Sequence, residues 1–380
     1  MESAAPAPLP PDPPGQPLLE GRVDLKGMEE GDLAALCQAM GEPPYRGRQL
    51  FGWIYARGEA DFERMTDLPK AFRARLEGRA RVGALLPERA EEAGDGTQKF
   101  AFRLAGGALV ESVKIPMRPG GGRPRWALCL STQAGCAMGC AFCLTGRMGL
   151  VRNLSAGEIA EQFLAARRTL PEGERFHNVV FMGMGEPLDN FEPSAAAARL
   201  LTHPRAGGVS ARRLTVSTVG VASRLAAFAR AAPGVGLAVS LHAADEATRG
   251  SLVPVNRKWG LKALLDACRE IPLAERRRLT FEYVLLAGVN DSPEDARRLA
   301  GLLRGIRCKV NLIPWNPFPG APFERPSPAR VEAFRAELLR AGLTATVRQT
   351  KGLDIRAACG QLADEARLGG PPLPRAGARA

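Results

Sequence analysis

The stretch Cys136-Ala-Met-Gly-Cys140-Ala-Phe-Cys143 determines how the rest of the chain is interpreted. It follows an apolar run at 126–131 that has the length of a buried strand. Three thiolates with this spacing on one loop can bind three irons of a cubane iron–sulfur cluster, which leaves the fourth iron without a protein ligand. A structural zinc site would normally need a fourth Cys or His nearby, and the histidines stand well downstream at His177, His203 and His242. The spacing therefore favours an open iron–sulfur cluster over zinc.

Further apolar runs of strand length recur along the chain, and a helical pattern follows each of them. The strand candidates are 126–131, 178–182, 213–217, 237–242, 280–286 and 309–313. Several helices have clear starts, since Ser155 and Glu158 have capping-box spacing and Ser292-Pro293 places Pro at the first helical position. About six βα units in series predict an α/β fold whose parallel sheet curls into a partial TIM-like barrel. In such a barrel, the chemistry belongs at the C-terminal ends of the strands.

A C-x-x-x-C-x-x-C loop after the first strand of a partial barrel resembles the radical S-adenosylmethionine (SAM) superfamily. The resemblance implies one 4Fe–4S cluster held by Cys136, Cys140 and Cys143, with SAM chelating the open iron. One electron from such a cluster cleaves the sulfonium of SAM and yields a 5′-deoxyadenosyl radical. The cofactor supplies this difficult chemistry, and the barrel excludes water and positions the target.

Residues at the other strand ends agree with a barrel that binds SAM. The turn Gly183-Met-Gly185-Glu186-Pro187 follows the second strand, where glycines let the backbone approach a ligand and Glu186 can accept from the SAM ammonium group. The further candidates at strand ends are Ser217, Ser240, Leu241, His242 and Asn316. Each one alone could be an ordinary loop residue. Together, on the face where a barrel binds ligands, they favour a SAM site.

Composition and charge exclude several classes of protein. No run approaches about 18 consecutive apolar residues, so a transmembrane helix is not expected, and the N-terminus lacks the pattern of a secretory signal. We therefore expect a cytoplasmic protein whose eight cysteines are thiols, metal ligands or redox catalysts. Lys and Arg number 52 against 40 Asp and Glu, and this net charge of +12 favours a polyanionic partner such as nucleic acid.

The chain is expected to contain five segments. We expect a disordered Pro-rich tail at 1–18, a helical RNA-docking domain at 19–92, a β-hairpin and linker at 93–122, the barrel at 123–350, and a C-terminal segment with a basic tail at 351–380. In the helical domain, arginines alternate with aromatic residues, a pattern that suits RNA docking. The alternative is a small helical cap whose aromatic residues fill its own core.

Two cysteines outside the triplet have less obvious roles. Cys129 lies inside the first predicted barrel strand, where a buried cysteine usually serves packing. Cys359 lies in a Gly-flanked segment after the last barrel helix and is harder to explain as part of the core. Cys37, Cys268 and Cys308 stand in apolar patterns and are interpreted as packing residues.

Eight segments between about residues 25 and 365 together resemble one family, the RlmN-like dual-specificity adenine-C2 methyltransferases of bacterial ribosomal and transfer RNA. These segments are GEPPYRGRQLFGWIYARG (41–58), ALVESVKIPM (108–117), ALCLSTQAGCAMGCAFCLTG (127–146), FMGMGEPLDN (181–190), LTVSTVG (214–220), AVSLHA (238–243), NLIPWNPFPG (311–320) and RQTKGLDIRAACGQL (348–362). The resemblance implies that one adenosine of 23S rRNA and one of certain tRNAs are methylated at C2, with two SAM molecules consumed per turnover.

The resemblance also implies roles for three further side chains. The thiolate of Cys359 takes a methyl group from one SAM. A radical from a second SAM removes hydrogen from that S-methyl group, and the methylene radical adds to C2 of adenine. Glu111 then removes the C2 proton, and Cys129 attacks the sulfur of Cys359, which releases the RNA and leaves a disulfide that must be reduced. Without the resemblance, Glu111 would be interpreted as an exposed carboxylate of the hairpin.

The expected partners follow from this chemistry. The target adenosine must flip out of any stacked helix, and the basic rim should hold phosphates in a salt-dependent way. An electron donor must feed the cluster, no membrane is involved, and nothing in the sequence demands more than a monomer. Two alternatives stay open: the related adenine-C8 methyltransferase of ribosomal RNA, and a non-catalytic iron–sulfur or zinc protein that binds RNA.

Overall fold

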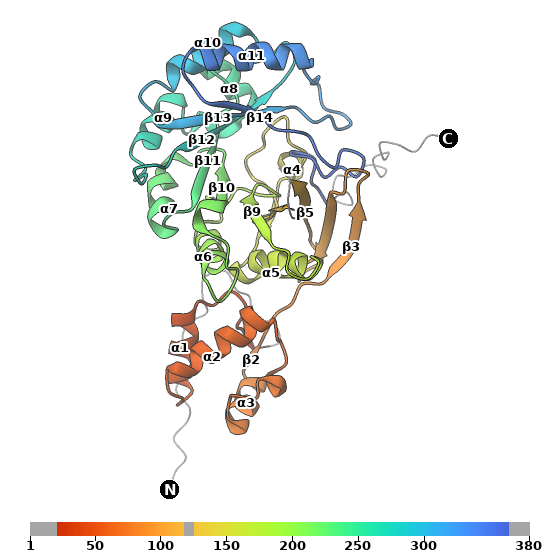
Figure 1. The fold of residues 1–380 in the computed structure, drawn as a ribbon, viewed down its shortest axis with the longest axis vertical. Helices are drawn as coiled ribbons and strands as arrows, with labels where there is room; N and C mark the ends of the chain where they lie inside the picture. Colours follow the sequence, from red (N-terminus) through yellow and green to blue (C-terminus); the bar gives the residue numbers. More distant parts are fainter. Residues whose placement is uncertain (1–20, 118–124, 365–380) are drawn as a thin grey trace, which may run out of the picture.

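The computed structural model describes residues 21–117 and 125–364, which form a small helical unit and a larger barrel-like unit (Figure 1). The predicted Pro-rich tail at 1–18 and the basic end of the chain lie outside the described residues. In the described part of the chain, no helix is both long enough and apolar enough to span a bilayer.

The helical unit lies below the barrel in Figure 1 and is built around aromatic residues. Its elements are β1 (Val23–Asp24), α1 (Glu30–Ala39), α2 (Tyr45–Phe51), a π-helical turn η1 (Gly52–Arg57), a 3-10 turn η2 (Phe62–Arg64), α3 (Lys70–Glu77) and β2 (Ala80–Arg81). Phe51 and Tyr55 are fully buried, whereas Trp53 is half-buried and Tyr45 is 44% exposed. The aromatic residues are therefore divided between the core and the surface of this unit.

One ten-stranded sheet forms the backbone of the larger unit. In sheet order, its strands are β14 (Ala345–Val347), β13 (Cys308–Pro314), β12 (Leu279–Leu285), β11 (Gly236–Ser240), β10 (Leu214–Thr218), β9 (Phe176–Phe181), β6 (Arg125–Cys129), β5 (Leu109–Met117), β4 (Gln98–Arg103) and β3 (Pro87–Glu92). In this sheet, β6 and β9 to β14 pair in parallel, whereas β3, β4, β5 and β6 pair antiparallel. The hairpin thus continues the barrel sheet.

The six strands predicted for the barrel are present as β6 and β9 to β13, within two residues of the expected ends. The predicted α/β fold, with a parallel sheet that curls into a partial TIM-like barrel, is therefore confirmed. Two strands of the ten-stranded sheet were missed. β14 is a three-residue strand, and β3 is a run of charged residues, Pro-Glu-Arg-Ala-Glu-Glu, that is mostly exposed. Neither segment has the apolar pattern from which a strand is predicted.

Helices cover the outside of the curled sheet, as Figure 1 shows. They are α5 (Ala156–Arg167), α6 (Phe191–Thr202), α7 (Leu225–Ala231), α8 (Glu246–Leu252), α9 (Leu261–Arg269), α10 (Pro293–Leu302) and α11 (Pro328–Arg340), with 3-10 turns η3 (Ala211–Arg213), η4 (Ala222–Arg224) and η5 (Pro254–Arg257). The short helix α4 (Leu144–Arg147) instead follows directly after Cys143. The predicted capping box at α5 is confirmed, because the Ser155 side chain accepts from Glu158 N–H and Glu158 accepts from Ser155 N–H.

The two units share one hydrophobic core, which includes the buried thiols of Cys37, Cys268 and Cys308. Packing therefore accounts for these three cysteines, as predicted. A buried ion pair of 2.9 Å between Lys26 Nζ and Glu161 also joins the units, from the segment after β1 to helix α5. Because breaking such a pair leaves an uncompensated buried charge, it ties the helical unit firmly to the barrel.

Candidate active site

The cysteine loop leaves the end of β6 and is held in place by backbone contacts. A small two-stranded sheet frames it, formed by β7 (Gln133–Gly135) and β8 (Leu150–Asn153). Gly135 has a φ of 72°, and a Cβ there would lie 1.9 Å from the Gly149 carbonyl oxygen, so this position requires glycine. Cys136 N–H donates to the same carbonyl at 2.9 Å. These backbone contacts fix the start of the loop.

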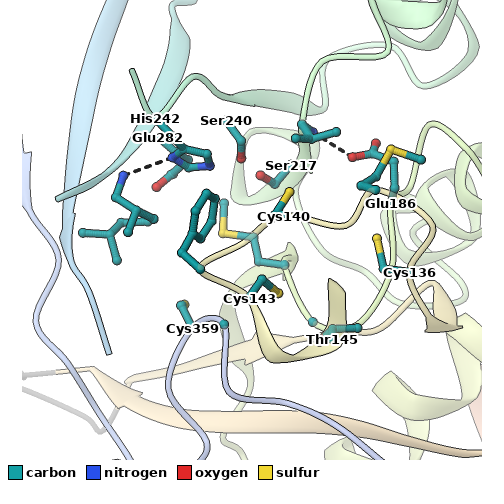
Figure 2. A pocket seen from close by; sticks show the side chains of 18 of the residues that line it. Cys136, Cys140, Cys143, Thr145, Glu186, Ser217, Ser240, His242, Glu282 and Cys359 are labelled. Atoms are coloured by element: carbon teal, nitrogen blue, oxygen red, sulfur yellow. Dashed lines mark hydrogen bonds between the residues drawn. The ribbon is translucent and has the colours of Figure 1, made fainter. Parts of the chain in front are cut away.

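Cys136, Cys140 and Cys143 all line one cavity at the C-terminal ends of the barrel strands. Figure 2 shows the three side chains spread around the same space, with Cys359 facing it from the C-terminal segment. Among the described residues, no three His, Cys, Asp or Glu side chains converge closely enough to hold a single metal ion. A 4Fe–4S cluster offers each cysteine a separate iron, so the spread triplet fits a cluster better than one zinc ion.

Six of the seven residues predicted to bind SAM line this cavity: Gly185, Glu186, Ser217, Ser240, His242 and Asn316. Leu241 does not belong to the lining, since its side chain is fully buried in the core. Gly185 has a φ of 101°, and a Cβ there would lie 2.6 Å from Gln133 N. This position therefore requires glycine because its backbone passes close to β7, and not only because a ligand would lie near it.

Glu186 and His242 are both buried and have strongly perturbed pKa values. Burial raises the pKa of Glu186 to about 7, although its carboxylate accepts from Val219 N–H at 2.7 Å and from Leu188 N–H at 3.0 Å. Burial, aided by nearby Arg249, lowers the pKa of His242 to about 3. Because His242 Nδ1 accepts from Val284 N–H at 3.0 Å, Nε2 of this neutral imidazole carries the proton (Figure 2).

Arg249, which was not among the predicted site residues, is fully buried and ties the strand ends together. Its guanidinium donates to the carbonyl oxygens of Val219 and Leu241 at 2.8 and 3.1 Å, and to Asn256 Oδ1 at 2.7 Å. Val219 follows β10 and Leu241 follows β11, so Arg249 sets the spacing of two strand ends that border the cavity. The helix Glu-Ala-Thr-Arg-Gly-Ser-Leu has the composition of a surface helix and gives no sign of this role.

Cys359 lies between the main cavity and a second cavity that is bordered by β5 and β6. The C-terminal segment that carries it is fastened to the cysteine loop, because Leu144 N–H donates to Gly360 O at 2.7 Å. Asn316 Nδ2 donates to the carbonyl oxygen of Cys359 at 3.0 Å. A residue predicted to bind SAM therefore also positions the cysteine predicted to carry the methyl group.

Cys129 ends β6 beside Cys359 and is only 4% exposed. Burial, together with the nearby Cys359, raises the pKa of Cys129 to about 12, and Arg348 opposes this rise. Arg348 also lines both cavities and interacts electrostatically with Cys359 and with the buried carboxylate of Glu282. Arg348 and Glu282 were not among the predicted site residues, although Arg348 stands at the start of the motif at 348–362 and Glu282 lies within the predicted strand at 280–286.

Glu111 lies on β5 and is only 2% exposed, so the alternative of an exposed hairpin carboxylate is wrong. One carboxylate oxygen lies 2.9 Å from Lys99 Nζ, and the other accepts from Ala363 N–H at 3.1 Å. Burial raises the pKa of Glu111, and Lys99 is the main opposing influence. Glu111 does not line the cavity. Leu362, which precedes its backbone partner Ala363, does line it.

Comparison with known proteins agrees with this site. The Ribosomal RNA large subunit methyltransferase N-terminal domain matches residues 23–82, and the Radical SAM superfamily matches residues 130–300. The chain is 48% identical to the dual-specificity RNA methyltransferase RlmN of Anaeromyxobacter dehalogenans, over 93% of this chain and 94% of that protein. The chain belongs to the RlmN family. The RlmN protein of Halorhodospira halophila is 50% identical, over 91% of this chain and 95% of its own length.

A solved structure extends the RlmN family match to the fold. The crystal structure of a radical SAM methyltransferase from Sphaerobacter thermophilus has a TM-score of 0.82 and 46% sequence identity. It covers 89% of this chain and 98% of that chain. The match therefore includes the helical unit and the barrel together.

Proposed function

We propose that this protein is a radical SAM enzyme that methylates C2 of adenosine in ribosomal RNA and transfer RNA. One observation carries the proposal: three cluster-type cysteines, the SAM-type strand ends and a fourth cysteine, Cys359, surround one cavity. A non-catalytic RNA-binding protein has no need for a thiol that faces the cluster site. The names of the relatives, which are RNA methyltransferases, support the same conclusion.

Cys136, Cys140 and Cys143 would hold a 4Fe–4S cluster, and Glu186, Ser217, Ser240, His242 and Asn316 would surround SAM beside it. Together, cluster and SAM supply a 5′-deoxyadenosyl radical when bound. The chain fixes this site through the backbone contacts of the cysteine loop and through buried Arg249. Buried walls exclude water, which protects a reactive intermediate from side reactions.

Cys359 is the proposed methyl carrier. Its sulfur becomes a thioether when it accepts a methyl group, and the carbon of that group is then joined to C2 of the adenine. Arg348 lines the same two cavities as this cysteine and interacts with it electrostatically. The thiolate is the nucleophilic form of a cysteine. Asn316 and Gly360 hold the backbone on both sides of the sulfur.

Cys129 is the proposed resolving residue. Its thiolate attacks the sulfur of Cys359, so that an S–S bond forms and the C–S bond breaks. The carbon keeps the electron pair of the C–S bond, takes a proton, and stays on the RNA as a methyl group. The buried position of Cys129 beside Cys359 suits attack on this one target. The resulting disulfide must be reduced by a thiol before the next turnover. We propose that Glu111 is the base that takes the C2 proton before this step.

The helical unit is the proposed RNA-docking domain. Tyr45 is exposed, Arg46 stacks over its ring at 4.9 Å, and Arg57 stacks over Trp53 at 3.8 Å. Such planar cation–aromatic pairs suit stacking against unpaired bases. We further propose that the protein is cytoplasmic, because its free thiols suit a reducing compartment. We also propose that it is a monomer and that it receives electrons from a separate donor.

The reconstituted protein is expected to convert SAM to 5′-deoxyadenosine and to produce 2-methyladenosine in RNA. The measurement is mass spectrometry of nucleosides after anaerobic incubation with iron, sulfide, SAM, a low-potential reductant and unmodified ribosomal RNA or tRNA. Formation of 8-methyladenosine would favour the C8 alternative. Stoichiometric zinc and no 5′-deoxyadenosine would contradict the proposal and favour a non-catalytic protein.

A further inference from the structure

Three charged side chains form a row across the hairpin sheet, on the face that carries Glu111. Glu91 on β3 stands directly opposite Lys99 on β4. Glu111 on β5 stands opposite Ala101, two residues along from Lys99. Since side chains two apart on a strand point to the same face, Glu91, Lys99 and Glu111 lie on one face of three neighbouring strands.

The row leads from the interior toward the surface. Lys99 Nζ lies 2.9 Å from the Glu111 carboxylate and 3.8 Å from the Glu91 carboxylate. The side chains of Glu111 and Lys99 are 2% and 4% exposed, whereas that of Glu91 is 19% exposed. Arg89 also contacts Glu91, at 3.1 Å. Lys99 therefore stands between a buried carboxylate and one that reaches water.

Lys99 is the closest positive charge to Glu111. Burial penalises the ionised form of Glu111, and Lys99 on β4, the Ala363 N–H of the C-terminal segment and Arg89 on β3 oppose that penalty. A general base must be ionised when it is needed and must lose its proton again before the next turnover. Because Glu111 is only 2% exposed, water alone neither keeps its carboxylate ionised nor carries its proton away efficiently.

We propose that Lys99 is the positioning residue that keeps Glu111 ready as a base and that Glu91 is the outlet for its proton. This inference rests on the proposed function and deepens it. Glu111 takes the C2 proton, the electron pair of the C–H bond stays with the adenine adduct, and the unpaired electron of the adduct would return to the cluster that supplied it. Lys99 then gives one proton to Glu91 and receives one from Glu111, and Glu91 passes its proton to water. No electron is transferred along the row, and Lys99 ends as an ammonium, as it began.

The Lys99→Met protein is expected to stall after the carbon is joined to the RNA. In the first turnover, the rates of Cys359 methylation and of 5′-deoxyadenosine formation should stay within about twofold of wild type. The rate of 2-methyladenosine release should fall about a hundredfold. Deuterium at C2 of the target adenosine should slow the variant more than wild type, because proton removal becomes rate-limiting. The matched control is Lys114→Met, another buried lysine of this sheet, which contacts Thr169 and Trp126 instead.

Two further variants separate a folding defect from the proposed role. Lys99→Arg keeps the positive charge and should recover part of the rate. Glu91→Gln leaves the Lys99–Glu111 pair intact. We expect this variant to release 2-methyladenosine more slowly, with a larger solvent isotope effect on the release rate. A Lys99→Met protein that releases 2-methyladenosine at the wild-type rate, or that loses every step equally with an unchanged isotope effect, would overturn the inference. Normal turnover by the Glu111→Gln protein would show that Glu111 is not the base. Failure of the wild-type protein to make any 2-methyladenosine would contradict the proposed function itself.

Discussion

The Cys129→Ala protein is expected to accumulate with RNA covalently attached to Cys359. Cys129 lies beside Cys359 at the buried end of β6 and has no other proposed partner for its sulfur. Without it, the carbon can be joined to adenine, but the C–S bond to Cys359 is not broken. The adduct should resist reducing agents, because a thioether is not a disulfide. Mass spectrometry of nuclease-treated protein expressed with native RNA locates the adduct.

Two other cysteine variants serve as controls for this result. Cys359→Ala should fold, bind SAM and form neither product nor adduct, because the methyl carrier is missing. Cys268→Ala removes a cysteine that is equally buried but lies in the core, and it should lose about 1–3 kcal/mol of stability with no adduct. An ordinary free thiol at Cys359 in the Cys129→Ala protein, with normal turnover, would remove the assigned mechanism.

Loss of one cluster cysteine is expected to abolish radical chemistry completely. Cys140→Ala should fold, since Cys140 lines the cavity and is not part of the main core. Two remaining thiolates do not hold a 4Fe–4S cluster with one open iron, so iron content and visible absorbance should fall together. Formation of 5′-deoxyadenosine should drop to background, which is measured by chromatography.

The matched variant for this prediction is Cys308→Ala, a buried cysteine at the start of β13. It should keep iron and sulfide at wild-type stoichiometry. A Cys140→Ala protein that retains full iron content and cleaves SAM would show that the cluster is held elsewhere.

The barrel could be predicted because its strands are buried on both faces. Runs such as 237–242 and 280–286 are mostly apolar, and their flanking helices begin at recognisable caps. The π-helical turn at 52–57 could not be predicted, since the local pattern is that of an α-helix that continues from α2. β3 forms because β4 offers it a free edge, which is a tertiary effect that its charged sequence does not reveal.

The candidate site also has residues that could be predicted from the sequence and residues that could not. The cysteine triplet could be predicted from local spacing, because the three ligands lie on one loop. The meeting of Cys129 and Cys359 depends on contacts between distant segments. This meeting and the role of Glu111 were expected only through a family resemblance. Arg249 and Lys99 were missed because an arginine in a polar helix and a lysine in an alternating strand look like surface residues. Their burial is set by the packing of neighbouring elements and leaves no local signal.

The central claim is that the RNA receives its carbon through an S-methyl group on Cys359 and not by direct displacement. SAM whose methyl group carries three deuterium atoms tests this claim most directly. The account predicts an adenosine whose C2 methyl group carries two deuterium atoms, together with one deuterium in 5′-deoxyadenosine, because the radical removes one before the carbon reaches the RNA. Transfer of all three deuterium atoms to the RNA methyl group would contradict it.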